Sequence, residues 1–407
     1  MDKEVLQRAI LRVESLGKIS DSPDFLQRTF LSKANRAAAS CVMGWMDELG
    51  MEMAHDAGGT VRGVLAGKFP AAKALLIGSH LDTVIDAGKY DGALGIICAV
   101  AALEQLRTEA VELDYPVHVL GFSDEEGVRF QSTYLGSAGV VGGLDAGMLS
   151  VRDEEGMTLG KLLEIEGWHE GAEIFSYDES SSAGYMELHI EQGRVLENAG
   201  EAVAIVSGIA GQARVRIAVE GLADHAGTTP MDLRKDALAG AAEMILSVER
   251  IAKERSGLVG TVGMIKVRPG ASNAIPQTAD FTLDMRQPDD AALSDSLDFL
   301  RNEMEDICAR RGLVMKWEMV QINAAVPCDA GMIEALLESA ERVTGKRRLM
   351  GSGAGHDGVM MSRTMPIGMI FIRCRAGLSH HPDEYAEPDD IASGIEVMVD
   401  FLKGRKG

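Results

Sequence analysis

The chain has 407 residues, roughly twice what one ordinary hydrophobic core needs, so we expect two domains. Its 62 acidic residues exceed its 40 basic residues and give a formal net charge of -22, which repels nucleic acid and anionic lipid surfaces. No apolar run reaches the roughly 18 residues that a membrane-spanning helix needs. We therefore expect a globular protein whose partners are neither nucleic acid nor a membrane.

The start of the chain and its cysteines favour a cytoplasmic location. Residues 1–17 mix acidic with apolar residues and predict an amphipathic helix rather than a signal peptide. The five cysteines include no CxxC pair, which is typical of reduced thiols rather than of a disulfide framework or a zinc ribbon. We expect all five to be buried and unreactive.

The first part of the chain alternates strand-like and helix-like segments. KALLIG (residues 73–78) predicts a strand, residues 92–109 a helix, and PVHVLGF (116–122) a second strand. This alternation predicts an α/β fold with a mostly parallel sheet. In such sheets, ligands bind beyond the carboxyl ends of the strands.

The pattern changes near residue 208. Strand-like and helical segments then follow in the order β, α, β, β, α, β, which describes an α+β sandwich of the split βαβ, ferredoxin-like type. The α/β pattern resumes with a helix at 333–344 and a strand at 366–374. The second domain is therefore predicted to be inserted into the first: residues 1–207 and 322–407 form one domain, and 208–321 form the other.

Imidazole and carboxylate groups gather where predicted strands end. They lie in SHLDTVIDAGKYDG (79–92), FSDEEG (122–127), YMELHIEQG (185–193), GSGAGHDG (351–358) and GLSHHPDE (377–384). Each cluster alone is compatible with a structural role, since a lone histidine is often a hydrogen-bonded core residue and an acidic pair can begin a helix. Together they supply the roughly five or six groups that a two-metal site for Zn, Mn, Co or Ni requires.

The same clusters belong to a longer series of motifs that covers the whole chain. In order, these are HLDTV, KYDG, SDEEG, ELHIEQG, DHAGTTPMDLRKD, SNAIP, DMR, SGAGHDG and GLSHHP. The series resembles the M20 metallopeptidase-type amidohydrolases, in the branch of allantoate amidohydrolases and N-carbamoyl-L-amino acid hydrolases. VIDAGKYDG, FSDEEGVRFQSTYLGSAG, GIAGQ and SGAGHDG are most similar to the allantoate amidohydrolases. The resemblance implies a dimetal-hydrolase catalytic domain with an inserted dimerisation domain.

The resemblance also implies two divalent metal ions per subunit, Mn or Zn first, with Co or Ni as alternatives. The implied ligands are His80, Asp91 as the bridge between both ions, Glu126, His189 and His380. His381 follows directly, so the last position is ambiguous by one residue, and the SH-x-P alignment favours His380. Glu125 would be the general base, and Asp82 would orient the imidazole of His80.

Other implied residues concern the substrate. His225 would reach the site of the partner subunit in a homodimer and donate to the developing oxyanion. Asp224 beside it replaces a more usual glycine, and it would either raise the pKa of that imidazole or cap a turn. Arg286 would bind a substrate carboxylate through two parallel hydrogen bonds. Three polar residues would surround the same ligand: Asn273, Gln192 and His356.

The implied reaction is hydrolysis of a linear ureido C–N bond. Allantoate is the first choice, giving ammonia, carbon dioxide and a ureidoglycine-type product, and an N-carbamoyl-L-amino acid or N-carbamoyl-β-alanine would fit the same residues. Peptide hydrolysis is a weaker alternative, because His189 stands where peptidases usually have aspartate and Arg286 suits a carboxylate. A catalytically silent binding protein is weaker still, because such a protein has no use for Glu125.

Overall fold

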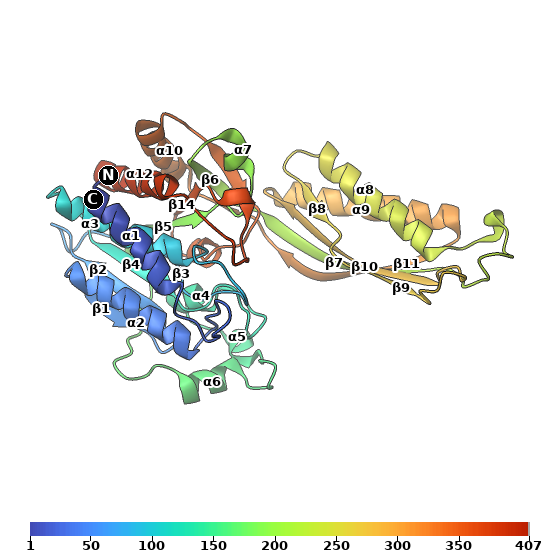
Figure 1. The fold of residues 1–407 in the computed structure, drawn as a ribbon, viewed down its shortest axis with the longest axis horizontal. Coiled ribbons are helices and arrows are strands. Elements are labelled where there is room, and N and C mark those ends of the chain that lie inside the picture. The colour runs from blue at the N-terminus through green and yellow to red at the C-terminus, as the bar shows by residue number, and fades with distance from the viewer. Residues whose placement is uncertain (406–407) are drawn as a thin grey trace. The chain divides into compact units, whose positions relative to one another are not determined.

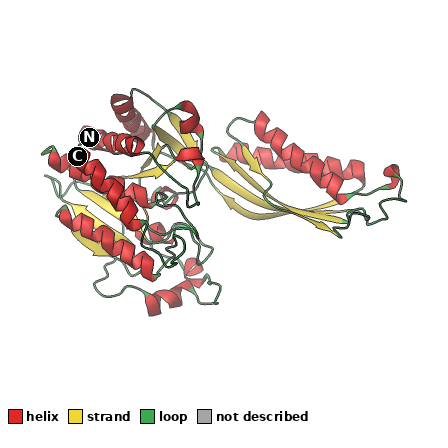
Figure 2. Cartoon of the chain, in the orientation of Figure 1, coloured by secondary structure: helices red, strands yellow, loops and turns green. Residues whose placement is uncertain are grey.

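The computed structural model describes residues 1–405 and divides the chain into two compact units (Figures 1 and 2). The first unit spans Met1–Ser207 and continues from Cys328, and the second spans Gly208–Pro327. The inserted unit thus ends at Pro327 rather than at the expected residue 321. The reason is that strand β11 (Val314–Asn323) keeps its pairing with the neighbouring strand of the second unit beyond that point.

Within residues 1–405, a nine-stranded mixed sheet has the order β1-β2-β4-β3-β5-β14-β6-β12, with β13 paired to β6. The first unit contains this sheet except for β12 and the last two residues of β6, which lie where the chain enters and leaves the second unit. The four central strands, from β4 to β14, are parallel, and the strands that flank them are antiparallel. This parallel centre confirms the predicted α/β class. The strands are β1 (Glu52–His55), β2 (Val61–Leu65), β3 (Ala74–His80), β4 (Val117–Phe122), β5 (Ser182–Ile190), β6 (Val203–Ile209), β12 (Val326–Pro327), β13 (Leu349–Ser352) and β14 (Ile367–Ile372).

Long helices complete the core of the first unit. Helix α3 is buried along almost its whole length, because it packs on β3 and β5 and is covered in turn by α1 and α12. Helix α2 packs on β1 and β2, and α10 packs on α12. The bounds are α1 (Lys3–Leu16), α2 (Lys33–Glu48), α3 (Ala93–Thr108), α10 (Ala330–Thr344) and α12 (Pro388–Gly404).

Short helices lie in the connections of the chain. They are α4 (Leu135–Val140), α5 (Ala146–Ser150), α6 (Leu159–Glu166), α7 (Val195–Ala199), α11 (Gly358–Met361) and the 3-10 turns Met231–Leu233 and Arg375–Gly377. No helix within residues 1–405 combines the length and the apolar composition that crossing a bilayer requires.

The second unit is an antiparallel sheet with the helices α8 (Ala237–Glu254) and α9 (Asp290–Arg311) packed on it. The order of elements matches the predicted β, α, β, β, α, β, except that the second predicted strand is divided into two. Along β7, alternate residues point into the core, as the period of two predicts. The strands are β7 (Gly211–Glu220), β8 (Val259–Thr261), β9 (Ile265–Arg268), β10 (Thr278–Gln287) and β11.

The tight contact between α3 and β5 yields a stability prediction. A Cβ atom added at Gly95 in α3 would lie 2.3 Å from the carbonyl oxygen of Leu188 in β5, so Gly95→Ala should lower the free energy of unfolding by about 1–3 kcal/mol. Gly44, exposed in α2, has no atom within 4 Å of such a Cβ. Gly44→Ala is therefore the matched control and should stabilise the protein by about 1 kcal/mol. Denaturant unfolding measures both, and equal effects of the two substitutions would contradict the close packing.

Candidate metal centre

The candidate ligands lie at one edge of the first unit's sheet, where its central parallel strands end. His80 is the last residue of β3, His189 is the penultimate residue of β5, and the FSDEEG segment follows the end of β4. His380 lies in the loop that follows β14. Since parallel strands deliver their carboxyl ends to the same edge, four segments far apart in the sequence meet here.

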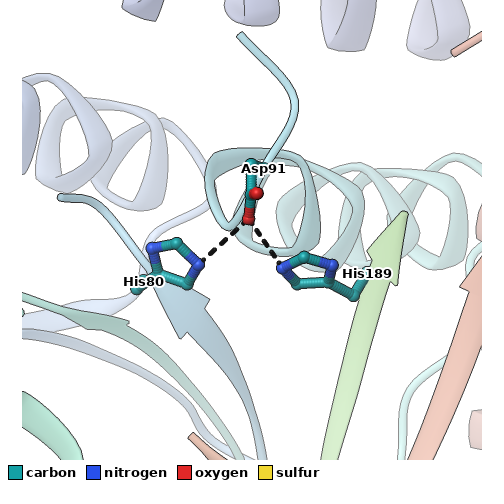
Figure 3. Close-up of side chains that lie close together, drawn as sticks. All are labelled: His80, Asp91 and His189. Atoms are coloured by element: carbon teal, nitrogen blue, oxygen red, sulfur yellow. Dashed lines mark ion pairs between the residues drawn. The ribbon is translucent and has the colours of Figure 1, made fainter. Parts of the chain in front are cut away.

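The carboxylate of Asp91 is the centre of this arrangement. Its Oδ1 atom lies 3.4 Å from Nε2 of His80 and 3.0 Å from Nε2 of His189, as Figure 3 shows. Its Oδ2 atom lies 3.3 Å from Nε2 of His380, which is also 3.2 Å from Oε1 of Glu126. One carboxylate oxygen of Asp91 thus faces His80 and His189, and the other faces His380.

Three overlapping groups have ligand atoms within 4.8 Å of one another. They are His80, Asp91 and His189; His80, Glu125 and Glu126; and Asp91, Glu126 and His380. Because Asp91 belongs to the first and last groups, it could supply a ligand oxygen to each. Imidazole nitrogen and carboxylate oxygen are the donors that Zn, Mn, Co and Ni accept in proteins.

Hydrogen bonds to the far side of each ring direct Nε2 toward the centre. Nδ1 of His80 lies 3.1 Å from the carbonyl oxygen of Asp82, and Nδ1 of His189 lies 2.9 Å from that of Ile190. The carboxylate of Asp82 also accepts hydrogen bonds from the backbone N–H groups of Glu125 (2.9 Å) and Glu126 (3.1 Å). Asp82 therefore orients one imidazole and holds the acidic turn beside it.

Arg28 supports the loop that carries Asp82, and no sequence motif pointed to it. Its guanidinium is 1% exposed and donates to the carbonyl oxygens of Leu81 (2.9 Å) and Leu16 (2.7 Å). Its backbone N–H donates to Oγ1 of Thr83 at 2.9 Å. Burial lowers the pKa of Arg28 to about 10, although the nearby charge of Asp82 opposes the shift. Arg28 thus holds the loop after β3 at a backbone carbonyl, that of Leu81, and at a side chain, that of Thr83.

Three groups of the site have strongly shifted pKa values. Burial raises the pKa of Glu125 well above its ordinary value, although His80 opposes the shift. Hydrogen bonds to Asp91 and then to Glu126 raise the pKa of His380 to about 10. Burial disfavours the charge of Asp91, yet the attraction of His189 and bonds from the three imidazoles hold its pKa well below its ordinary range. Since ligands bind metal without their protons, a divalent cation would replace these protons, and the donor set fits one.

Two of the expected substrate residues lie beside the cluster. Nε2 of Gln192 donates to Oδ2 of Asp91 at 2.9 Å and to Oγ of Ser379 at 3.1 Å. The ring of His356 packs edge-on against that of His189, with centroids 4.6 Å apart, and its Nε2 lies 2.8 Å from Oγ of Ser352. The structure therefore brings Gln192 and His356 together with the candidate ligands, Glu125 and Asp82.

The other expected substrate residues belong to the second unit. His225 and Asn273 lie close together, because the backbone at His225 bridges to Ala274 and the N–H of Ala226 donates to the carbonyl of Asn273 at 3.0 Å. Arg286 is on β10 and forms two hydrogen bonds to the carboxylate of Asp284, at 2.9 and 3.2 Å.

Comparisons with known proteins were made for the whole chain. Residues 76–404 match the profile of peptidase family M20/M25/M40. An allantoate deiminase of Arabidopsis thaliana is 40% identical, over 98% of this chain and 82% of that protein. An N-carbamoyl-L-amino acid amidohydrolase of Geobacillus stearothermophilus is 36% identical over 96% of each. The crystal structure of a hydantoinase/carbamoylase family amidase from Burkholderia ambifaria superposes with a TM-score of 0.91 at 32% identity, covering 99% of this chain and 98% of that one.

Proposed function

The chain belongs to peptidase family M20/M25/M40 and is a hydrolase, and from this premise we propose that it cleaves the ureido C–N bond of a linear ureido acid. Allantoate is the proposed substrate, with ammonia, carbon dioxide and a ureidoglycine-type compound as products. The observation that carries the proposal is the carboxyl group of Glu125, buried beside a cluster of three imidazoles and two carboxylates. The similarity to an allantoate deiminase over almost the whole chain supports the choice of substrate.

We propose that the cluster holds two divalent cations, with Mn or Zn before Co or Ni. His80 and His189 would hold one, His380 and Glu126 the other, and Asp91 both. Bound cations of this kind polarise a carbonyl group and lower the pKa of water. Asp82 would keep the imidazole of His80 in the tautomer whose Nε2 lone pair faces the site.

Glu125 is the proposed general base. Its backbone is held by Asp82, its side chain is 8% exposed, and its carboxyl group lies within 4.8 Å of ligand atoms of His80 and Glu126. Burial raises its pKa, which brings the group nearer to neutral pH and lets one carboxyl both accept and return a proton. It would take a proton from the attacking water and deliver one to the departing nitrogen.

Arg286 is the proposed clamp for the carboxylate of a ureido acid. A guanidinium can bind a carboxylate with two parallel hydrogen bonds, which the ammonium of lysine does not reproduce. Asp284 already pairs with Nε and Nη2 of Arg286 and thereby orients the plane of the guanidinium. An incoming carboxylate would compete with Asp284 for this guanidinium. Asn273, Gln192 and His356 are proposed to bind the rest of the ligand.

We propose that the chain forms a homodimer through its second unit and that His225 donates to the oxyanion in the partner's site. Strand β11 is an edge of its sheet and exposes apolar side chains, with Val314 at 61%, Val320 at 55% and Ile322 at 63%. Exposed edges of this kind pair readily with another chain. His225 is itself exposed, as a residue that serves a second subunit must be.

An N-carbamoyl-L-amino acid is the second candidate substrate, since a relative that is named for this activity is 36% identical over 96% of both chains. It has the same ureido group and carboxylate as allantoate, and it would use the same residues. N-carbamoyl-β-alanine is a further alternative. A peptidase or a catalytically silent protein is disfavoured, because neither explains both Glu125 and Arg286.

The substrate proposal predicts a clear preference in kcat/KM. Metal-free protein is reconstituted with Mn, Zn, Co or Ni, and ammonia release is measured for allantoate, several N-carbamoyl-L-amino acids and N-carbamoyl-β-alanine. We expect allantoate to give the highest kcat/KM, by about tenfold or more. A higher value for a carbamoyl amino acid would replace the substrate but keep the roles of the residues. Inactivity on every ureido acid with every metal would refute the proposed function.

Glu125→Gln tests the general base. The amide keeps the size of the side chain but cannot accept the proton, so kcat should fall by about 100-fold to 10,000-fold while metal content is unchanged. Metal analysis and steady-state kinetics on the same preparation measure both quantities. A variant that keeps more than about a tenth of the wild-type rate would contradict the role as base.

A site shared across the dimer predicts complementation. Glu125→Gln and His225→Ala subunits should each be inactive, yet a mixed dimer should regain activity because one of its two sites combines an intact Glu125 with the partner's intact histidine. Dimers purified with two different affinity tags provide the material for the assay. No recovery in such verified mixed dimers would count against the shared site.

A further inference from the structure

We propose that Glu384 is a positioning residue that fixes the carboxylate of Asp91 and joins the two loops that carry Asp91 and His380. The inference rests on the proposed metal function of these two residues. Glu384 lies four residues beyond His380 in the sequence. Its side chain contacts the turn around Asp91, which is 293 residues away along the chain. No role was assigned to it from the sequence.

The contacts of Glu384 are made to the backbone of the candidate bridging ligand itself. Oε1 accepts hydrogen bonds from the N–H groups of Tyr90 (2.8 Å) and Asp91 (2.9 Å). Oε2 lies 3.1 Å from Oγ of Ser379, and that hydroxyl lies 2.5 Å from Oδ2 of Asp91. Glu384 thus binds the main chain of Asp91 directly, and it contacts the side chain of Asp91 indirectly, through Ser379.

The site is built to receive this carboxyl group. Glu384 is 2% exposed, and among residues 1–405 no lysine, arginine or histidine forms an ion pair with it. A buried carboxyl group without a cationic partner is costly unless hydrogen-bond donors satisfy it. Gly88 allows the approach, because a Cβ atom there would lie 2.3 Å from Cβ of Glu384. In this position a single oxygen of Glu384 accepts from both N–H groups.

The loop that carries His380 has a backbone that needs such an anchor. His380 has a φ of 55°, in the left-handed region that side chains with a Cβ disfavour. Residues in this region persist where the surrounding structure holds them. The N–H of Glu384 donates to the carbonyl of His381 at 3.0 Å, which closes the turn, while the carboxyl group of Glu384 fastens that turn to Tyr90 and Asp91. Loss of this anchor would release two candidate ligands together.

The test separates the reach of the side chain from its charge. Glu384→Gln keeps an oxygen that can accept from the N–H groups of Tyr90 and Asp91, but it removes the negative charge. Glu384→Asp keeps the charge, but its side chain is shorter by one methylene group, so its oxygens lie farther from these N–H groups. Glu387→Asp is the matched control, since its carboxyl group is half-exposed and pairs with Arg375. Mn²⁺ affinity is measured by calorimetric titration of metal-free protein, and amide hydrogen exchange of residues 88–92 is followed in the same samples.

We expect Glu384→Asp to weaken Mn²⁺ binding by about 10-fold to 100-fold and to speed amide exchange, the range typical of residues that orient metal ligands. Glu384→Gln and Glu387→Asp should both stay within about threefold of wild type. Wild-type affinity in Glu384→Asp would overturn the inference, and so would an equal loss in Glu384→Gln, because charge rather than reach would then matter. If the wild-type protein binds none of Mn²⁺, Zn²⁺, Co²⁺ and Ni²⁺, the proposed metal function fails and this inference with it.

Discussion

The site depends on one constraint: a single buried carboxylate, that of Asp91, is surrounded by three imidazoles that come from three separate segments. Such an arrangement is costly in an apolar interior unless charges are balanced and each ring is held in place. The parallel centre of the sheet makes it possible, since β3 and β5 end side by side and deliver His80 and His189 to the same edge.

The surrounding structure compensates for the cost of this arrangement with hydrogen bonds from buried side chains to neighbouring loops. Asp82 holds a ring and an acidic turn, Arg28 holds the loop of Asp82, and Glu384 holds the turn of Asp91. All three side chains are almost fully buried. They act on the backbone of neighbouring loops, so the position of the candidate ligands is set by loops that are themselves rigid.

Sequence patterns predicted the helices and strands in which the alternation of apolar and polar residues, or an unbroken apolar run, is clear within one segment. The buried runs of β3, β4 and β14, the helices α1, α3 and α10 and the β, α, β, β, α, β order of the second unit have a clear pattern. The patterns did not predict β1 and β2, because strands of four and five residues carry little periodic signal. They also placed the end of the inserted unit at residue 321, since the pairing of β11 is irregular between Met319 and Gln321 and continues to Asn323.

The sequence by itself determined which chemical groups are present and, through motifs such as HLDTV and SDEEG, which residues to consider as ligands and base. Only the tertiary structure decided that Asp91 lies at the centre and that Arg28 and Glu384 support it. The physical reason is that both supports bind backbone N–H or carbonyl groups. Every residue has such groups, so no pattern of side chains in the sequence identifies the partner, and the folded chain alone brings the two together.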